Sequence, residues 1–276
     1  MIQAAVIDVA TLAGGLILTG AVAGVMAGLL GVGGGIVIVP VLFNLLGALG
    51  IEPDLRMHVA VGTSLATIIP TAIVSARAHA RRGAVDAALV RIWGPWIAVG
   101  TVIGTFAATR MNGRSLAAVF GVVALAVAVD LVRRRNAPSG SIAEARLPRP
   151  AGQRAIASTI GFFSALMGIG GGTLTVPVLN WFSYPMHRAV ATSAVFGLII
   201  AIPAAIGYVW GGWDHPGLPT GNLGYVNLMG FALIAAATFI TAPYGTRIAH
   251  AISARALRLV FATFLAATAL RMLANI

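Results

Sequence analysis

Two short and nearly identical stretches of the chain have a backbone suited to binding a ligand. The first reads GVGGGIVIVP over residues 31–40, and the second reads GIGGGTLTVP over residues 168–177. Glycine has no Cβ, so a ligand can approach its backbone closely, and it tolerates the positive φ angles that a chain break requires. A helix that restarts after such a break presents its first N–H groups and the positive end of its dipole. The two stretches therefore predict a site for an anion.

A pair of hydroxyl side chains follows each glycine stretch in a second repeated motif. This motif reads MHVAVGTS over residues 57–64 and MHRAVATS over residues 186–193. A hydroxyl can donate a hydrogen bond to an oxyanion, but within a helix it can equally bond to a carbonyl group of the preceding turn. With the glycines and the threonine after the second glycine run, the candidate substrate-binding residues are Gly33, Gly34, Gly35, Thr63, Ser64, Gly170, Gly171, Gly172, Thr173, Thr192 and Ser193.

The glycines also have a simpler interpretation, which stays open at this point. Glycines in membrane helices often serve only to let two helices pack closely. The duplication of the whole stretch, with Pro40 and Pro177 at the same place in each copy, favours a functional break. A nucleotide-binding loop is excluded, because no strand pattern precedes the glycines and no GK[ST] sequence is present.

Few other residues could carry chemistry. Cysteine is absent and the five histidines lack metal-binding spacing, so we expect no enzyme, no metal and no cofactor. The seven acidic residues fall in loops or at segment ends, whereas cation and proton carriers usually keep a carboxylate at mid-span. An anion is therefore the expected ligand. For His58 and His187, which open equivalent helices, both a gating role and a helix-capping role stay open.

The elements that must position these residues are membrane helices. The chain is 59% hydrophobic and only 9% charged, whereas soluble domains carry about 25% charged residues. No basic start precedes the first apolar run, so we expect a spanning helix there and not a cleaved signal peptide. The expected helical segments are 9–30, 32–49, 58–76, 88–110 and 115–132, and then 155–169, 171–183, 187–211, 224–245 and 254–274.

The order of the motifs divides the chain into two related halves. We expect a first transmembrane repeat at 1–132, a cytoplasmic linker at 133–154 and a second transmembrane repeat at 155–276. All 18 basic residues are arginines, and those of the loop at 77–86 have no counterpart at 212–223. Because cytoplasmic loops collect basic residues, this asymmetry predicts that the second half is inverted, with both termini outside. The expected fold is all-α and polytopic, with two inverted repeats that each contain a Gly-rich broken-helix hairpin.

The net charge of +11 raises the question of nucleic acid as a partner. The arginines lie between apolar runs and form no stripe, so they are better explained as topology signals that face the lipid bilayer. We therefore expect the bilayer and a small anion as partners and no nucleic acid, and leave open whether the chain forms a homo-oligomer.

The sequences GVGGGIVIVPVL and GIGGGTLTVPVLN, each followed by MHxAVxTS, resemble those of the sulfite exporter TauE/SafE family of membrane permeases. The resemblance implies a multi-pass permease of the cell inner membrane. It also implies a small sulfur-containing anion as substrate, such as sulfite, thiosulfate or an organosulfonate. The two halves differ at Gly62 against Ala191 and at Thr67 against Phe196, so the two half-sites are unequal. An anion-selective channel built on the same broken helices is the alternative.

Overall fold

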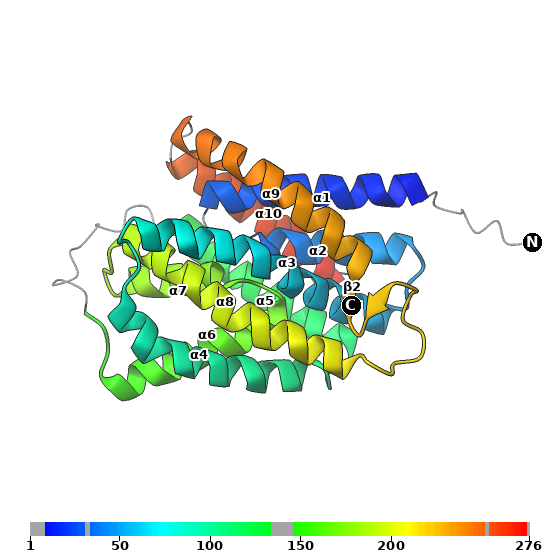
Figure 1. Cartoon of the computed structure of the whole chain (residues 1–276), viewed down its shortest axis with the longest axis horizontal. Helices are drawn as coiled ribbons and strands as arrows, with labels where there is room; N and C mark the ends of the chain where they lie inside the picture. Colours follow the sequence, from blue (N-terminus) through cyan, green and yellow to red (C-terminus); the bar gives the residue numbers. More distant parts are fainter. Residues whose placement is uncertain (1–8, 31–33, 134–145, 252–253, 275–276) are drawn as a thin grey trace, which may run out of the picture.

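The fold is a bundle of helices that lie nearly along one common direction (Figure 1). This computed structural model describes residues 9–30, 34–133, 146–251 and 254–274. The helices are α1 (Val9–Leu30), α2 (Gly35–Ala48), α3 (Pro53–Arg81), α4 (Ala87–Ala108), α5 (Gly113–Arg133), α6 (Pro150–Met167), α7 (Gly171–Trp181), α8 (Met186–Gly211), α9 (Leu228–Ala251) and α10 (Ala254–Ala274). A short antiparallel hairpin, β1 (Asn222–Leu223) and β2 (Val226–Asn227), precedes α9.

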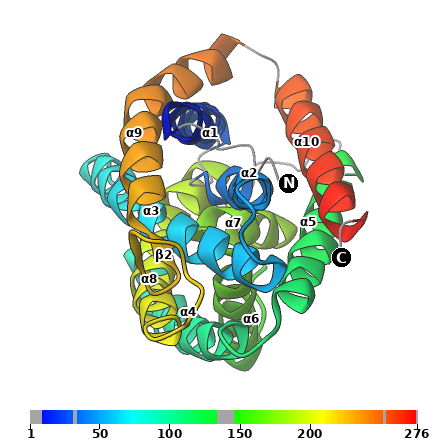
Figure 2. The ribbon, with the colours of Figure 1, turned by 90° about the vertical axis from the view of Figure 1, so that its right-hand side faces the viewer.

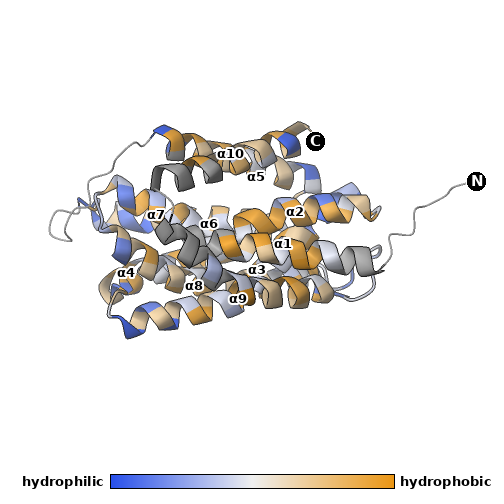
Figure 3. Cartoon of the chain, turned by 90° about the horizontal axis from the view of Figure 1, so that it is seen from above, coloured by the Kyte–Doolittle hydropathy of each residue, from blue (hydrophilic) through white to orange (hydrophobic). Residues whose placement is uncertain are grey.

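The surface of the bundle is apolar along its helices. Four helices of the described residues are long and apolar enough to cross a membrane, namely α3, α4, the Gly113–Asp130 part of α5, and α8. Large apolar side chains such as Phe106, Ile206 and Phe239 are each 62% exposed on the outside. Figure 3 shows hydrophilic residues gathered mainly toward the helix ends. This distribution fits a lipid environment, because exposed apolar area of this extent is unfavourable in water.

The two halves of the chain form one interlocked arrangement in which equivalent helices run in opposite directions. In Figure 1, α3 runs from right to left and α8 from left to right, and α4 and α9 are opposed in the same way. Helix α1 packs against α9, and its equivalent α6 packs against α4. Each half therefore supplies helices to the other half's packing, as expected for inverted repeats.

The predicted glycine breaks are confirmed. Helix α1 ends at Leu30 and α2 begins at Gly35, after Gly34 has adopted a left-handed φ of 68°. Helix α6 ends at Met167 and is followed by Gly168, whose φ is 66°. Both conformations favour glycine because a Cβ would clash with the backbone. Gly33 lies outside the described residues.

The predicted helices exist, but several of their boundaries differ from the prediction. Helix α3 starts at Pro53, since proline is favoured in the first turn of a helix, where an N–H group would have no partner. Helix α6 starts at Pro150 for the same reason, inside the predicted linker 133–154. The segment predicted at 224–245 begins as a helix only at Leu228, because Gly224, with φ of 55°, forms the turn of the hairpin.

Candidate functional site

The two glycine breaks meet inside the bundle. A Cβ added to Gly35 would lie 2.6 Å from the carbonyl oxygen of Gly168 and 3.1 Å from Ser64 Oγ. Ser64 in turn donates a hydrogen bond of 2.7 Å to the same carbonyl oxygen. Seen end-on, α2 and α7 lie at the centre, with other helices around them (Figure 2). The start of α2, Ser64 of α3 and the break before α7 thus form one central cluster.

Both short helices begin with backbone N–H groups in buried surroundings. In α2, Val37 and Ile38 donate to Gly34 O at 3.0 and 3.1 Å, so the N–H groups of Gly35 and Ile36 precede the first bond of the helix. In α7 the bond from Thr173 N–H to Gly170 O, at 3.4 Å, opens the helix in the same way. The positive ends of two helix dipoles therefore lie in a region of low polarity, where they interact strongly with an anion.

Three buried hydroxyls near the second break have no hydrogen-bond partner among the described residues. They are Thr173 Oγ1 and Thr175 Oγ1, in the first turns of α7, and Ser164 Oγ, in the last turn of α6. None of the three residues is more than 3% exposed. A buried polar group that lacks a partner costs about 1–3 kcal/mol. A ligand that accepts their hydrogen bonds would remove this cost.

The equivalent positions of the first half carry no hydroxyls, although Thr105 Oγ1 of α4 is also buried without a partner among the described residues. At the offset that relates the two glycine stretches, Thr173 and Thr175 correspond to Ile36 and Ile38, and Ser164 corresponds to Ala27. The hydroxyl donors of the candidate site therefore come from the second half. Ser164 and Thr175 were not among the predicted residues. Comparing the repeats position by position would have found them, because each replaces an apolar residue in an otherwise matching motif.

The threonines of the repeated TS pairs hold the start of a helix in the opposite half. Thr63 Oγ1 accepts a hydrogen bond of 2.9 Å from the backbone N–H of Asn227, and Thr192 Oγ1 accepts one of 3.0 Å from the backbone N–H of Asp86. Asp86 and Asn227 are equivalent residues that directly precede α4 and α9. Their side chains accept from the N–H groups of Leu89 and Gly230, three residues on. The geometry gives both threonines a structural role as acceptors.

The serines of the TS pairs are also engaged. Ser64 Oγ donates to Gly168 O, and Ser193 Oγ donates to Val190 O at 2.8 Å, within its own helix. In this conformation both serine protons therefore point to carbonyl groups. A Cβ added to Gly171 would lie 2.8 Å from Ser193 O and 2.8 Å from Gly197 N. The second glycine run thus also lets α7 approach α8 closely, as the packing interpretation expects.

A polar contact outside the membrane-spanning segments fixes one end of α4. The Tyr184 hydroxyl donates to Asp86 Oδ2, and burial together with this bond raises the pKa of Tyr184. Burial alone would raise the pKa of the Asp86 carboxyl, but the bonds from Tyr184 and from backbone N–H groups, with the nearby charge of Arg188, lower it overall. Asp86 is therefore ionised at neutral pH and caps the positive end of α4.

Among the described residues, neither His58 nor His187 forms a hydrogen bond with the central cluster, and their surroundings differ. His58 is 4% exposed, and its ring nitrogens lie 2.8 Å from Asp54 O and 3.0 Å from Ala108 O. It joins the start of α3 to the end of α4, and its ring packs on that of Tyr225. His187 is exposed. Within the described part of the chain, no three histidine or acidic side chains gather as metal ligands do.

The apolar surface and the four long apolar helices are those of a membrane protein, and comparison with known proteins gives its general class, a membrane transporter. The family model described as sulfite exporter TauE/SafE matches residues 16–272. The chain belongs to this family.

Related chains in other organisms carry the same general description. A probable membrane transporter protein of Haemophilus influenzae is 32% identical over 93% of this chain and 96% of its own length. YunE of Bacillus subtilis, a probable membrane transporter protein, is 31% identical over 71% of this chain and 78% of its own. A probable membrane transporter protein of Methanocaldococcus jannaschii is 28% identical over 94% of both chains. No solved structure matches this chain.

Proposed function

We propose that the protein is a secondary transporter for a small sulfur-containing anion such as sulfite, thiosulfate or an organosulfonate. It acts as a multi-pass protein of the cell inner membrane and binds the anion near the midplane, between the two helix breaks. The family supports transport, and its description as sulfite exporter supports the sulfur anion. The repeats would alternate access to this central site by moving against each other.

One observation carries the anion assignment. Thr173 and Thr175 in α7 and Ser164 at the end of α6 carry three buried hydroxyls without partners among the described residues. Hydroxyls and helix-start N–H groups are donors, so together they suit a ligand made of oxygen acceptors. Each hydrogen bond to a charged ligand contributes about 1.5–3 kcal/mol. For the anion to enter, the contact between Gly35 and Gly168 must open.

The alternative is an anion-selective channel that uses the same broken helices. A carrier exposes its site to one side at a time, so its flux saturates, and unlabelled substrate inside vesicles drives uptake of labelled substrate by counterflow. A channel passes current continuously and gives single-channel openings. The contact between the two breaks favours the carrier, because it closes the centre in this conformation.

The test uses purified protein in proteoliposomes. Uptake of sulfite, thiosulfate, sulfate, taurine and sulfoacetate is measured with and without unlabelled anion inside. We expect saturable uptake and counterflow for at least one sulfur anion, and a loss of affinity of about tenfold or more in Thr173→Val, since about 1.4 kcal/mol corresponds to a factor of ten. Uptake of none of these anions, or uptake of cations instead, contradicts the proposal.

A further inference from the structure

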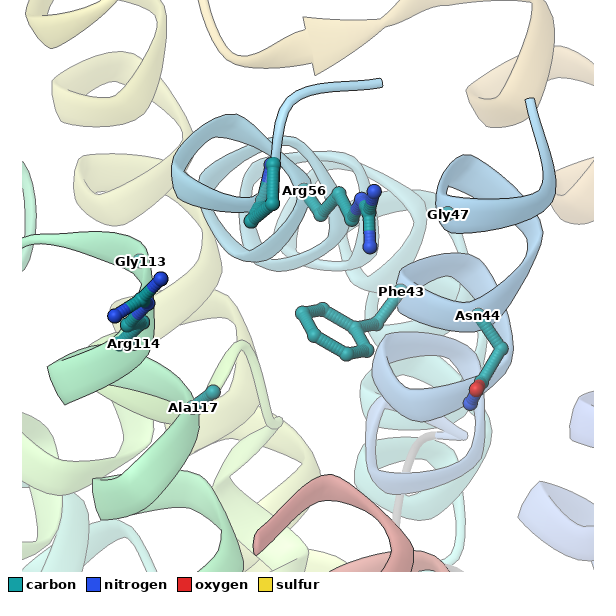
Figure 4. Close-up of a pocket in the computed structure, with 8 residues that line it drawn as sticks. Phe43, Asn44, Gly47, Arg56, Gly113, Arg114 and Ala117 are labelled. Carbon is teal, nitrogen blue, oxygen red and sulfur yellow. The ribbon is translucent and has the colours of Figure 1, made fainter. Parts of the chain in front are cut away.

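A cavity of about 360 Å³ lies at the end of the bundle where α2 ends and where α3 and α5 begin (Figure 4). We propose that it is a second binding site, for a small organic oxyanion that has a charged headgroup and a short apolar body. The residues that line it are Phe43, Asn44, Gly47, Pro53, Arg56, Gly113, Arg114 and Ala117. The proposal rests on the proposed function only for the choice of ligand to test.

Two guanidinium groups supply the positive charge of this cavity. Arg56 and Arg114 approach it from α3 and α5, and neither can lose its charge at physiological pH. Arg56 Nε donates to Ile51 O at 2.6 Å, which fixes the side chain, and Nη1 lies 3.2 Å from where a Cβ on Gly47 would be. This bond limits the orientation of the remaining N–H donors of Arg56. The residues that line the cavity include no acidic side chain that could pair with either arginine.

The backbone around the cavity adds to this charge. Pro53 and Gly113 are the first residues of α3 and α5, and a Cβ on Gly113 would lie 2.5 Å from Asp54 O, so the two helix starts are in direct contact. The positive ends of both helix dipoles therefore lie at the cavity. With two arginines beside them, they favour a ligand that carries negative charge.

The size and apolar wall of the cavity argue for a ligand with a body. A volume of 360 Å³ equals the share of about twelve liquid water molecules, which a bare inorganic oxyanion would only partly fill. Figure 4 shows the Phe43 ring between the α2 and α5 walls, with Ala117 on the α5 side. A few carbon atoms can pack on these side chains while the headgroup binds the arginines. A cavity of this size is within the range of small-molecule sites.

Helix α2 connects this cavity to the central site. It begins at the break, with Gly35, and Phe43 and Gly47 lie on its second half. At about 1.5 Å per residue, Phe43 is about 12 Å along the axis from Gly35. The cavity is therefore distinct from the central cluster, although the same helix contributes to both.

The experiment uses the absence of cysteine from the chain. One reporter variant carries a single cysteine in place of Ala117, and a second carries it in place of Phe43. Phe43 is half-buried, so a cysteine there stays reactive if the one at Ala117 does not react. Labelling rates are compared for two thiol reagents of equal size, one with a sulfonate and one with a trimethylammonium group. A cysteine at Leu223, exposed on the hairpin outside the cavity, is the control.

We expect the sulfonate reagent to label the cavity cysteine at least tenfold faster than the cationic one, with both rates similar at Leu223→Cys. This preference should fall about tenfold in Arg56→Gln combined with Arg114→Gln, and should return in Arg56→Lys combined with Arg114→Lys. Ethanesulfonate should protect the cavity cysteine and leave the control unprotected.

Equal rates for the two reagents, a preference that survives removal of both arginines, or no protection by ethanesulfonate each overturns the proposal. Uptake into proteoliposomes separates the two proposals. Protection without uptake of any sulfur anion leaves the cavity site standing and contradicts the proposed transport. Uptake of a sulfur anion without protection of the cavity cysteine supports the proposed transport and overturns the cavity site.

Discussion

The hydroxyl of Ser64 and the carbonyl oxygen of Gly168 are 2.7 Å apart, and this bond joins the TS motif of the first half to the glycine break of the second. Its counterpart differs, because Ser193 bonds to Val190 within the same helix. Ser64→Ala should therefore lower the free energy of unfolding by about 1–3 kcal/mol, since it leaves a buried carbonyl group unpaired. Thermal unfolding in detergent measures this change. Ser193→Ala is the matched control, and an equal loss there would mean that the cross-half bond adds nothing.

A side chain on Gly35 should disrupt the centre. The added Cβ of Gly35→Ala would lie 2.6 Å from Gly168 O, a distance at which the backbone must shift. We expect lower thermal stability and loss of uptake in the protein that stays monodisperse. Gly14→Ala places its Cβ in open space within α1 and should leave both properties unchanged or raise stability slightly. Normal uptake by Gly35→Ala would show that the two breaks need not approach this closely.

Removal of the unpaired hydroxyls should lower the affinity for the anion without lowering the stability of the protein. Thr173→Val and Thr175→Val keep the shape of the side chain but remove a buried hydroxyl that has no partner in the described part of the chain. Stability should stay equal or rise, while affinity for the transported anion should fall about tenfold per residue. Thr71→Val is the control, because its hydroxyl bonds to carbonyl groups of its own helix. If stability falls and affinity does not, these threonines are structural.

The threonines that accept backbone N–H bonds should behave in the opposite way. Thr63→Val and Thr192→Val each leave the N–H group of Asn227 or Asp86 without its acceptor, which should cost about 1–3 kcal/mol of stability. Serine keeps the oxygen, so Thr63→Ser and Thr192→Ser should recover most of it. Unfolding midpoints of the four variants test this, and a valine variant as stable as its serine partner would contradict the assigned bonds.

The ionisation of Asp86 should make the stability of the folded protein depend on pH in the acidic range. Its pKa in the folded protein is lowered, so its stabilisation is complete above the unfolded pKa, which is about 3.9, and is lost as the pH falls through the lower folded value. Asp86→Asn can still cap α4 but cannot ionise, so its melting temperature should fall less between about pH 5 and pH 3. Tyr184→Phe should also weaken the acid dependence, since it removes a bond to the carboxylate. The same fall of melting temperature with pH in the unmodified protein, Asp86→Asn and Tyr184→Phe would contradict this role of Asp86.

Periodicity, arginine placement and the duplicated glycines predicted the all-α fold, the order of the helices and the two breaks. These features are local in sequence or repeat within it. The bonding of the site could not be predicted, because it depends on contacts between residues far apart in the chain. The TS pairs illustrate this point. From the sequence they were expected to donate to an anion, whereas Thr63 and Thr192 accept bonds from residues more than one hundred positions away.

Two of the three hydroxyl donors, Ser164 and Thr175, were missed for a related reason, whereas Thr173 was among the predicted residues. Ser164 and Thr175 each stand where the first repeat has an apolar residue, but their burial without partners among the described residues appears only in the structure. The role of Gly33, which lies outside the described residues, stays a prediction. The use of Gly34, Gly35 and the glycines at 170–172 by an anion also stays a prediction, since in this conformation the breaks contact protein.

The exchange of helix caps between halves has a consequence for the synthesis of the chain. Helix α4 is made before Thr192, the residue that accepts the N–H bond of its cap, and α1 is made about two hundred residues before its packing partner α9. The first five helices must therefore enter the membrane before their contacts with the second half can form, and they remain without these contacts until the rest of the chain is translated. Assembly can finish only near the end of translation, so a ribosome that stops early leaves a product with unpaired helix faces, which is prone to aggregate.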